Sequence, residues 1–555
     1  MRLLFNRAFY LLIFTVCVFP ADLVAQLSQG GVPGSFSHAI APESGNFISI
    51  DPPSTDQLSM EETKPGVAYS FAVNLPVDIG MDNSGLWTTT ADGTRIWRVT
   101  VKASGALALT LYFDRFAMPE NGKLFVYNPQ RTQIIGAFTN QNNNRHSTFA
   151  TSLIYGDQLT LEYNAPEGTP DPVMHVSEVA YAYRGVSDYS GLKTGFGGSG
   201  PCEVNTNCDE GAAWQLQKRS VTRILIKRTG QTDVWCTGSL VNNVRNDGTP
   251  YVLTADHCGR YSSETDISKW IFYFNYEGTG CPDPTKEPTL YSLTGATMVA
   301  HGGNAAASGS DFFLVLLDKP IPTSYNVYFN GWTRESVPPS PSGVTIHHPE
   351  GDIKKISTYT KALQPTVWTG GSKLAHWLVY WTKTTNGQGV TEGGSSGSPL
   401  YDNQGRLVGT LTGGDSRCDT AHINLPDYYG MFSYSWDKNG TDSTEVLKYW
   451  LDPDSTNVMS LNGWALGVEE NVNNEWVAMY PNPVTNQLNI RMAAGATKSL
   501  KVTLYDILGN LQYQRALGFN ENREIQVDVS ELSPGIYVVM VNDGNRQVVR
   551  KVIKE

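Results

Sequence analysis

The chain has 555 residues, too long for a single hydrophobic core, and it is expected to form about two to four domains. Its formal net charge of −12 and pI near 5.3 exclude the basic face of a typical nucleic-acid-binding protein, so we expect no nucleic-acid partner. Tyr, Trp, Thr, Asn and Gly are abundant and long amphipathic helical patterns are scarce. This composition favours an all-β fold.

Residues 1–25 have the pattern of a secretory signal peptide. Arg2 and Arg7 precede an apolar run from Ala8 to Phe19, and Ala25 offers a small residue for cleavage. The run is too short to span a membrane, and no later segment rivals it. We therefore expect an exported protein.

The cysteines are confined to one part of the chain. Cys17 lies in the signal peptide, and the remaining six fall between Cys202 and Cys418. In an exported protein this clustering predicts three disulfides within one domain. A zinc site is a weaker interpretation, because the cysteines form no Cys-x-x-Cys pair and no histidine pair at helical spacing accompanies them.

Residues 26–193, which follow the signal peptide, contain no cysteine and are rich in strand-like runs. Arg95–Lys102, Leu107–Phe113 and Leu159–Tyr163 alternate apolar and polar residues and are separated by turn residues. We predict a β-sandwich-like domain, either an independent binding module or a pro-domain that chaperones or blocks the next domain. A Gly- and Ser-rich linker that contains Lys193 follows it.

Residues 194–465 form the disulfide-bearing domain. Its predicted strands are short, and only the segment from Ser443 to Leu451 looks helical. This pattern favours a β-barrel enzyme over an α/β hydrolase. A polar linker over 466–475 separates it from a small, cysteine-free β-domain over 476–555.

The stretch Glu392–Pro399 (EGGSSGSP) is a candidate for a nucleophile loop. Gly394, Gly397 and Pro399 suit a tight turn that presents one hydroxyl and directs backbone N–H groups to one point. A serine nucleophile with an oxyanion hole requires this geometry. A surface loop can have the same composition, so this stretch alone does not distinguish a nucleophile loop from a surface loop.

Among nine histidines, His257 is the best candidate for the base, because an apolar strand ends there and Cys258 can fix its backbone. Asp311 begins the apolar run Phe312–Leu317, where a partly buried carboxylate needs a partner such as an imidazole N–H. The nearest rival acid, Asp256, would point to the opposite face of a strand. The rival pair His347 and His348 is followed by Pro349 and a charged stretch and is interpreted as loop or packing residues, whereas His301, His376 and His422 have no special sequence context.

Three motifs resemble those of trypsin-like serine proteases: LTADHC over Leu253–Cys258, SDFFL over Ser310–Leu314 and GSSGSP over Gly394–Pro399. Together with CTGSLVNN at 236–243 and IHHP at 346–349, they are more similar to the bacterial lysyl endopeptidases. The resemblance implies a chymotrypsin-like double β-barrel that cleaves peptide bonds through an acyl-enzyme. It implies Ser396 as nucleophile, His257 as general acid and base, Asp311 as orienting carboxylate, and the amides of Gly394 and Ser396 as the oxyanion hole.

The same resemblance implies the disulfide pairing, which the spacing alone leaves open. The implied pairs are Cys202–Cys418, Cys208–Cys281 and Cys236–Cys258.

The resemblance also bears on specificity. Trypsins carry an acid six residues before the nucleophile, but here that residue is Val390. In the lysyl endopeptidases the acid comes from a later segment that matches Asp427, so we expect cleavage after Lys, with Arg or mixed specificity as the alternative. The family stacks a histidine on a tryptophan beside the site; Trp368 matches the tryptophan, but Thr412 stands at the histidine position.

A lysine-specific enzyme could process itself. We expect cleavage after Lys193, which would release the segment from Gln26 as a propeptide.

The terminal domain carries YPNPV at 480–484, LYDILG at 504–509, LSPGIYV at 532–538 and RKVIK at 550–554. As a set they resemble the C-terminal sorting domain of type IX secretion substrates, an Ig-like β-sandwich of Bacteroidota. This implies the type IX machinery as a partner and export across the outer membrane. A carbohydrate-binding or adhesion sandwich is the alternative.

We therefore expect a secreted or cell-surface serine endopeptidase that acts on proteins or peptides as a monomer and without a cofactor or catalytic metal. A structural calcium stays open. A non-catalytic adhesin on a protease scaffold is the alternative from another class, and the intact His257, Asp311 and Ser396 speak against it.

Overall fold

The computed structural model describes most of the chain. The described residues are 28–38, 40, 47–54, 58, 67–186, 196–302, 309–337, 340–368, 371–465, 477–492, 499–506, 511–518, 524–542 and 547–554. The expected signal peptide, Lys193 and the linker over 466–475 lie outside these residues. Within them, no helix has the length and apolar character needed to cross a membrane.

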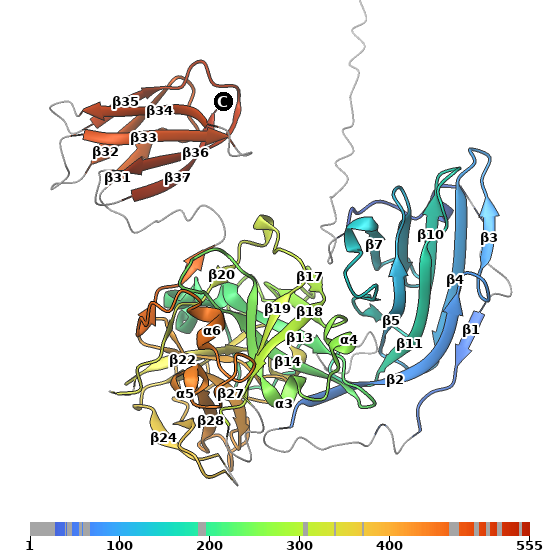
Figure 1. The fold of residues 1–555 in the computed structure, drawn as a ribbon, viewed down its shortest axis with the longest axis horizontal. Helices are drawn as coiled ribbons and strands as arrows, with labels where there is room; N and C mark the ends of the chain where they lie inside the picture. The colour runs from blue at the N-terminus through green and yellow to red at the C-terminus, as the bar shows by residue number, and fades with distance from the viewer. Residues whose placement is uncertain are drawn as a thin grey trace, which may run out of the picture.

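The N-terminal domain (47–186) is built from two facing sheets (Figure 1). One sheet holds β1 (Phe47–Ile50), β3 (Leu86–Thr89), β4 (Arg95–Ala103), β6 (Lys123–Tyr127), β7 (Ile134–Phe138) and β10 (Gln158–Ala165). The other holds β2 (Tyr69–Gly80), β5 (Ala108–Ala117), β8 (Phe149–Ala150), β9 (Ile154–Tyr155) and β11 (Val173–Ala182). Apolar residues that alternate along both sheets, such as Val99, Leu161, Leu111 and Val179, form one core between them.

The second of these sheets continues into the central domain (196–465). Its strand order is β17-β16-β13-β14-β2-β11-β5-β8, and β2 pairs with β14 in antiparallel orientation. The N-terminal domain is therefore joined to the central domain through backbone hydrogen bonds as well as through the linker.

The central domain contains two barrel-shaped sheets. The first is formed by β13 (Val221–Ile226), β14 (Asp233–Leu240), β15 (Tyr251–Ala255), β16 (Ile271–Phe274), β17 (Tyr291–Thr294), β18 (Ala296–His301) and β19 (Phe312–Leu317). The second is formed by β12 (Val204–Asn205), β21 (Trp332–Thr333), β22 (Gly343–His347), β23 (Lys355–Tyr359), β24 (Gln364–Thr366), β25 (His376–Val379), β26 (Pro399–Asp402), β27 (Leu407–Gly414), β28 (Asp427–Met431) and β29 (Ser460–Leu461). A small pair, β20 (Tyr328–Phe329) with β30 (Trp464–Ala465), packs beside them. The predicted all-β fold is confirmed.

Helices are few and short among the described residues: α1 (Gly34–Ser37), α3 (Asp256–Gly259), α4 (Glu264–Ile267), α5 (Phe432–Asp437) and α6 (Lys448–Leu451). The helix expected over Ser443–Leu451 is confined to α6. The sequence did not indicate α5, because its six residues are too few to show a helical period. Its Trp436 packs on the buried Trp332 with ring centroids 4.7 Å apart.

Three disulfides cross-link the central domain, and they are the pairs that the resemblance implies. Cys202–Cys418 ties the start of the domain to the segment between β27 and β28. Cys208–Cys281 joins the start of the domain to the loop after β16, and Cys236–Cys258 joins β14 to α3.

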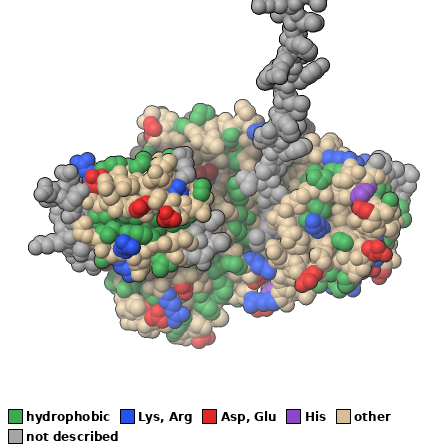
Figure 2. Space-filling model, turned by 90° about the horizontal axis from the view of Figure 1, so that it is seen from above, with side chains coloured by type: hydrophobic (Ala, Val, Ile, Leu, Met, Phe, Trp, Pro, Cys, Tyr) green, Lys and Arg blue, Asp and Glu red, His purple; other side chains and the backbone are tan. Residues whose placement is uncertain are grey.

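The C-terminal domain (477–554) is a β-sandwich (Figure 1). One sheet holds β31 (Val477–Tyr480), β32 (Gln487–Met492) and β35 (Glu524–Asp528); the other holds β33 (Ser499–Asp506), β34 (Leu511–Gly518), β36 (Gly535–Asn542) and β37 (Gln547–Lys554). Buried Val, Leu and Ile side chains of both sheets fill its interior. On the face shown in Figure 2, acidic and basic side chains of the described residues are interspersed and form no continuous basic patch.

Candidate active site

His257 lies just after a strand of the first barrel, in a short helix. β15 ends at Ala255, and α3 carries His257 as its second residue. The Cys236–Cys258 disulfide fixes the next residue to β14, so the backbone of His257 is held from two sides. The side chain is 3% exposed, so the imidazole is largely shielded from solvent.

Asp311 holds this histidine through two hydrogen bonds. Its Oδ2 accepts from Nδ1 of His257 at 2.8 Å, and its Oδ1 accepts from the backbone N–H of His257 at 2.9 Å. Because Nδ1 carries the proton in this bond, Nε2 of a neutral His257 is left as the proton acceptor. Asp311 is fully buried and has a φ of 58°, an unfavourable value for a non-glycine residue that is retained next to this contact.

Asp256 is directed elsewhere, but not for the reason expected from the sequence. The prediction placed it in a strand, whereas it begins α3. Its Oδ1 pairs with Nδ1 of His301 at 3.0 Å.

Ser396 lies in the loop before β26, between the two barrels. Its backbone carbonyl accepts from the N–H of Thr237 in β14 at 2.8 Å, which attaches the loop to the first barrel. Gly394 has a φ of 90°, a value that L side chains rarely adopt, so a glycine is required there. Among the described residues, the Ser396 hydroxyl makes no hydrogen bond, so the bond to His257 would form when a substrate closes the site.

Two amides of this loop are free donors. Ser395, Gly397 and Ser398 donate their backbone N–H groups within the protein. Over the described part of the chain, the N–H groups of Gly394 and Ser396 donate none. Two unpaired donors that flank one serine can stabilise a negatively charged oxygen beside its hydroxyl.

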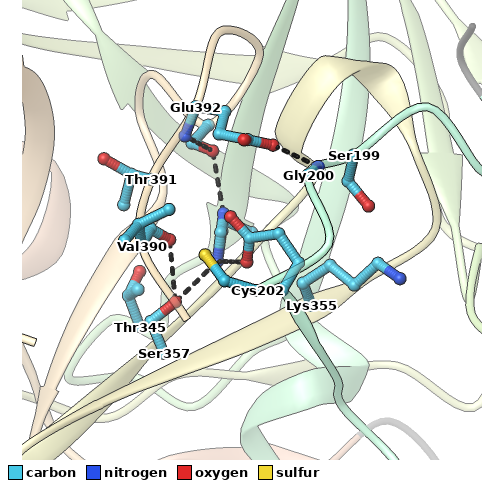
Figure 3. Close-up of polar contacts among 12 residues, drawn as sticks. Ser199, Gly200, Cys202, Thr345, Lys355, Ser357, Val390, Thr391 and Glu392 are labelled. Carbon is cyan, nitrogen blue, oxygen red and sulfur yellow. Dashed lines mark hydrogen bonds and ion pairs between the residues drawn. The ribbon is translucent and has the colours of Figure 1, made fainter. Parts of the chain in front are cut away.

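The histidine pair that the sequence assigned to packing lies directly behind this loop. The Ser395 hydroxyl accepts from the N–H of Glu392 at 3.2 Å and contacts Nδ1 of His347 at 2.8 Å. Nε2 of His347 faces Ser357 Oγ at 3.1 Å and Glu203 Oε2 at 3.6 Å (Figure 3). The ring is thus neutral with its proton on Nε2, and burial lowers the pKa of His347 to about 3.

The role of His347 is therefore to fix the loop rather than to accept a proton from a nucleophile. In Figure 3, Gly200 also donates to Glu392 on the same side of the loop. Glu203, Glu392 and Cys418 approach one another here, but the disulfide to Cys202 removes the thiolate that a metal would need. His348 is bound to the Asp352 carbonyl at 2.9 Å and is equally buried.

Asp427 is a fully buried carboxylate at the start of β28. Its Oδ2 accepts from Trp381 Nε1 at 2.5 Å, from Ser416 Oγ at 2.6 Å and from Thr391 Oγ1 at 2.8 Å. Its Oδ1 accepts from the N–H of Ser416 at 3.2 Å. All these donors are neutral, and burial raises the pKa of Asp427 to about 6.

The Asp427 carboxylate lies close to the backbone of the adjacent strand β27. Gly414 lies opposite Asp427 in the β27–β28 ladder, and a Cβ added to Gly414 would come within 2.0 Å of Asp427 Oδ1. A glycine is therefore required at this close approach. Val390, the residue six before Ser396, is fully buried in the apolar core of the second barrel. Asp419, by contrast, is an exposed residue paired with His422.

A histidine does lie beside Trp368, and the sequence analysis overlooked it. His376 in β25 has its ring 6.0 Å from that of Trp368, and its Nε2 contacts Thr412 Oγ1 at 3.0 Å. Thr412 in β27, which stands at the family's histidine position, thus bonds a histidine from β25, which lies two strands away in the sheet. The sequence alone could not place His376 beside Trp368, because its position depends on the pairing of β25 with β28, in which His376 lies opposite Gly430.

A double β-barrel with His257, Asp311 and Ser396 gathered between the barrels defines a serine endopeptidase of the chymotrypsin fold. Residues 196–430 match the family described as lysyl endopeptidase, C-terminal domain, and residues 478–555 match the secretion system C-terminal sorting domain. The chain is thus a lysyl endopeptidase-like serine protease with a C-terminal sorting domain. The sorting domain makes it an exported protein, secreted or held at the cell surface.

Among curated proteins the chain is similar to a lysyl endopeptidase of Pseudomonas aeruginosa, with 26% identity over 385 residues, 67% of this chain and 80% of the relative. Solved structures give weaker likenesses. A Glu endopeptidase in complex with MPD is 16% identical, with a TM-score of 0.25 over 42% of this chain and 93% of its own. A DUF3244 protein from Bacteroides vulgatus with an immunoglobulin-like β-sandwich is 11% identical, with a TM-score of 0.13 over 14% of this chain and 85% of its own.

Proposed function

We propose that this serine endopeptidase cleaves after lysine, with His257, Asp311 and Ser396 as its catalytic residues. The observation that carries the specificity is Asp427, a buried carboxylate surrounded by neutral donors. A lysine ammonium is the partner that such a carboxylate needs, and a buried cation of a substrate needs such a carboxylate. The curated relative is itself named a lysyl endopeptidase.

The geometry supports a mechanism with a covalent intermediate. Nε2 of His257 accepts the proton of Ser396 Oγ as the oxygen attacks the carbonyl carbon of the lysine residue. Asp311 keeps the imidazole in the required tautomer and stabilises its charged form. The N–H groups of Gly394 and Ser396 bind the oxygen of the tetrahedral intermediate.

The intermediate then collapses. His257 gives its proton to the leaving amine, which departs and leaves the lysine carbonyl esterified to Ser396. A water molecule, deprotonated by the same imidazole, hydrolyses the ester and restores the enzyme.

The proposal is tested with a peptide library digested by the purified enzyme and read by mass spectrometry. Cleavage after Lys is the expected result, and cleavage after Arg or after uncharged residues would contradict it. A fluorophosphonate probe should label the wild type and fail to label Ser396→Ala, because labelling requires an activated serine.

We also propose how the chain matures. Residues 26–193 are the propeptide, released by self-cleavage after Lys193, and 194–465 are the protease domain. The linker over 466–475 and the domain over 476–555 direct export by the type IX machinery, and the mature enzyme is a monomer. Mass spectrometry of the exported protein should find Thr194 at its N-terminus, and Ser396→Ala should remain uncut at this bond when expressed alone.

A further inference from the structure

We propose that strand β2 inhibits the uncleaved enzyme selectively, by occupying the part of the cleft that binds the substrate residues after the scissile bond. Residues 68–72 would lie there as a product does. This inference rests on the proposed catalytic residues and on Asp427 as the lysine-binding acid.

The edge of β14 leads directly from the nucleophile. Thr237, in the middle of β14, donates its N–H to the carbonyl of Ser396, and the adjoining Cys236 is bonded to Cys258 beside His257. The next residues along this edge, Trp235 to Asp233, extend away from Ser396. Asp427 belongs to the second barrel, so a substrate with lysine bound there would place its following residues against the first barrel and this edge.

β2 occupies this edge as an added strand. Tyr69 pairs with Trp235, Ser70 with Val234 and Ala72 with Asp233, in antiparallel register. Peptides that bind by strand addition use the same backbone hydrogen bonds. Figure 1 shows β2 reaching from the N-terminal domain to the central domain.

The direction of β2 is that of a leaving group. Its first residue, Tyr69, lies at the end nearest Ser396, and the strand then runs away from the nucleophile. The chain after a scissile bond must run the same way. Ala68, just before β2, is buried in the same apolar cluster as Cys236 and Cys258.

Buried side-chain contacts hold the strand in place. Phe71 stacks on Trp235 with ring centroids 4.5 Å apart. Asp233, fully buried, accepts from the Tyr112 hydroxyl at 2.5 Å and from Asn74 Nδ2 at 2.7 Å, and both donors belong to the N-terminal domain. These contacts do not depend on the linker, so cutting the linker alone leaves them intact.

A further contact brings β2 close to the oxyanion loop. Burial and the nearby Glu350 carboxylate raise the pKa of the Tyr69 hydroxyl. The N–H of Glu350 donates to the carbonyl of Gly393, the residue before Gly394, at 2.5 Å. Glu350 thus connects Tyr69 of β2 with the loop that contains Gly394 and Ser396.

The consequence is a block that depends on substrate length. A substrate with nothing beyond its leaving group does not need the β14 edge, whereas a longer peptide must displace β2. A tethered strand has an effective concentration in the millimolar range, so its competition with a longer peptide can reach roughly 100-fold.

The test compares two substrates on the uncleaved chain. Lys193→Gln, verified by mass as intact, is assayed with a lysine p-nitroanilide and with a quenched peptide that has four residues after its lysine. Relative to mature enzyme freed of the N-terminal domain, we expect p-nitroanilide hydrolysis within about threefold and peptide cleavage lower by roughly 100-fold. Equal loss on both substrates, or no loss on the peptide, would overturn the proposal.

A second pair of variants addresses the strand itself. In the Lys193→Gln chain, Tyr69→Ala with Phe71→Ala should restore peptide cleavage by at least tenfold and leave p-nitroanilide hydrolysis unchanged. Leu86→Ala, on the exposed face of β3, is the matched control and should restore nothing. If the double variant behaves like this control, β2 is not the inhibitor.

The two proposals fail in different ways. If the mature enzyme does not cut after lysine, the proposed specificity is wrong, and the same length comparison is repeated with substrates of the residue that it does cut. Labelling of intact Lys193→Gln by a fluorophosphonate reports on Ser396 independently of both.

Discussion

Replacing Asp427 by asparagine is the change that bears most directly on specificity. The substitution keeps the size of the side chain and removes its charge. In the wild type a lysine ammonium would pair with a fully buried carboxylate, and breaking such a pair costs about 3 to 5 kcal/mol. The value of kcat/KM for lysine substrates should therefore fall by roughly 100- to 4,000-fold.

The assay is kcat/KM on matched peptides that differ only in the residue before the scissile bond, lysine or methionine. We expect Asp427→Asn to lose activity on the lysine peptide and to keep or gain it on the methionine peptide. Equal loss on both peptides would show a general defect instead. An unchanged preference for lysine would refute the role of Asp427.

The pH dependence gives a second readout of the same residue. Only the ionised carboxylate attracts lysine, and the pKa of Asp427 is raised to about 6. The lysine-to-methionine ratio of kcat/KM should fall as the pH drops below about 6 in the wild type, whereas the ratio in Asp427→Asn should stay flat. Taking the ratio cancels the pH effects that act equally on both peptides.

Stability should change in the opposite sense. The folded-state pKa of about 6 lies above the ordinary 3.8, so ionising Asp427 destabilises the fold as the pH rises from about 4 to 6. The difference corresponds to about 3 kcal/mol. Asp427→Asn should be more stable than the wild type by up to this amount at pH 8, with the gain vanishing near pH 4. Urea unfolding at both pH values measures it, and a loss of stability at pH 8 would contradict the reasoning.

Three other changes follow from the structure. Ser396→Ala and His257→Ala should each lower kcat by at least roughly 10⁴-fold, and activity within tenfold of the wild type would exclude the proposed roles. His376→Ala removes the ring between Trp368 and Thr412, and we expect kcat/KM to fall about tenfold. His376→Gln, which can still bond Thr412, should recover part of this activity. Equal loss in both variants would assign the effect to packing. Removing residues 476–555 should leave the enzyme active but retained inside the cell, as immunoblots of culture medium and cell fractions would show; normal export of the truncated chain would rule out the sorting role.

The sequence carried much of this site because its motifs are local. His257, Ser396 and Asp311 each lie in a short run whose residue types match one catalytic task, and the structure places them together. The orientation of His376 and His347 could not be predicted, because their partners Thr412 and Ser395 lie in other segments that only the folded sheet brings alongside them. Asp256 was set aside for a wrong reason, since the strand ends at Ala255, two residues before His257.

The fold shows the same division. Continuous apolar runs bounded by turn residues, such as Phe312–Leu317, match the observed strands. The sharing of one sheet by two domains was invisible, because backbone pairing between β2 and β14 depends on docking rather than on side-chain pattern. α5 was missed for the related reason that one turn of helix is stabilised by the surface it packs on.

The shared sheet has a consequence for the biosynthesis of this enzyme. An unpaired sheet edge lined by aromatic residues invites association with other chains, and a protein that must cross two membranes is exposed to that hazard for a long time. Pairing of β2 with β14 covers this edge during transit. If the N-terminal domain is released as proposed, the same N–H and C=O groups would become available to pair with a substrate backbone. The sheet edge that is prone to association during export would thus bind polypeptide substrates in the mature enzyme.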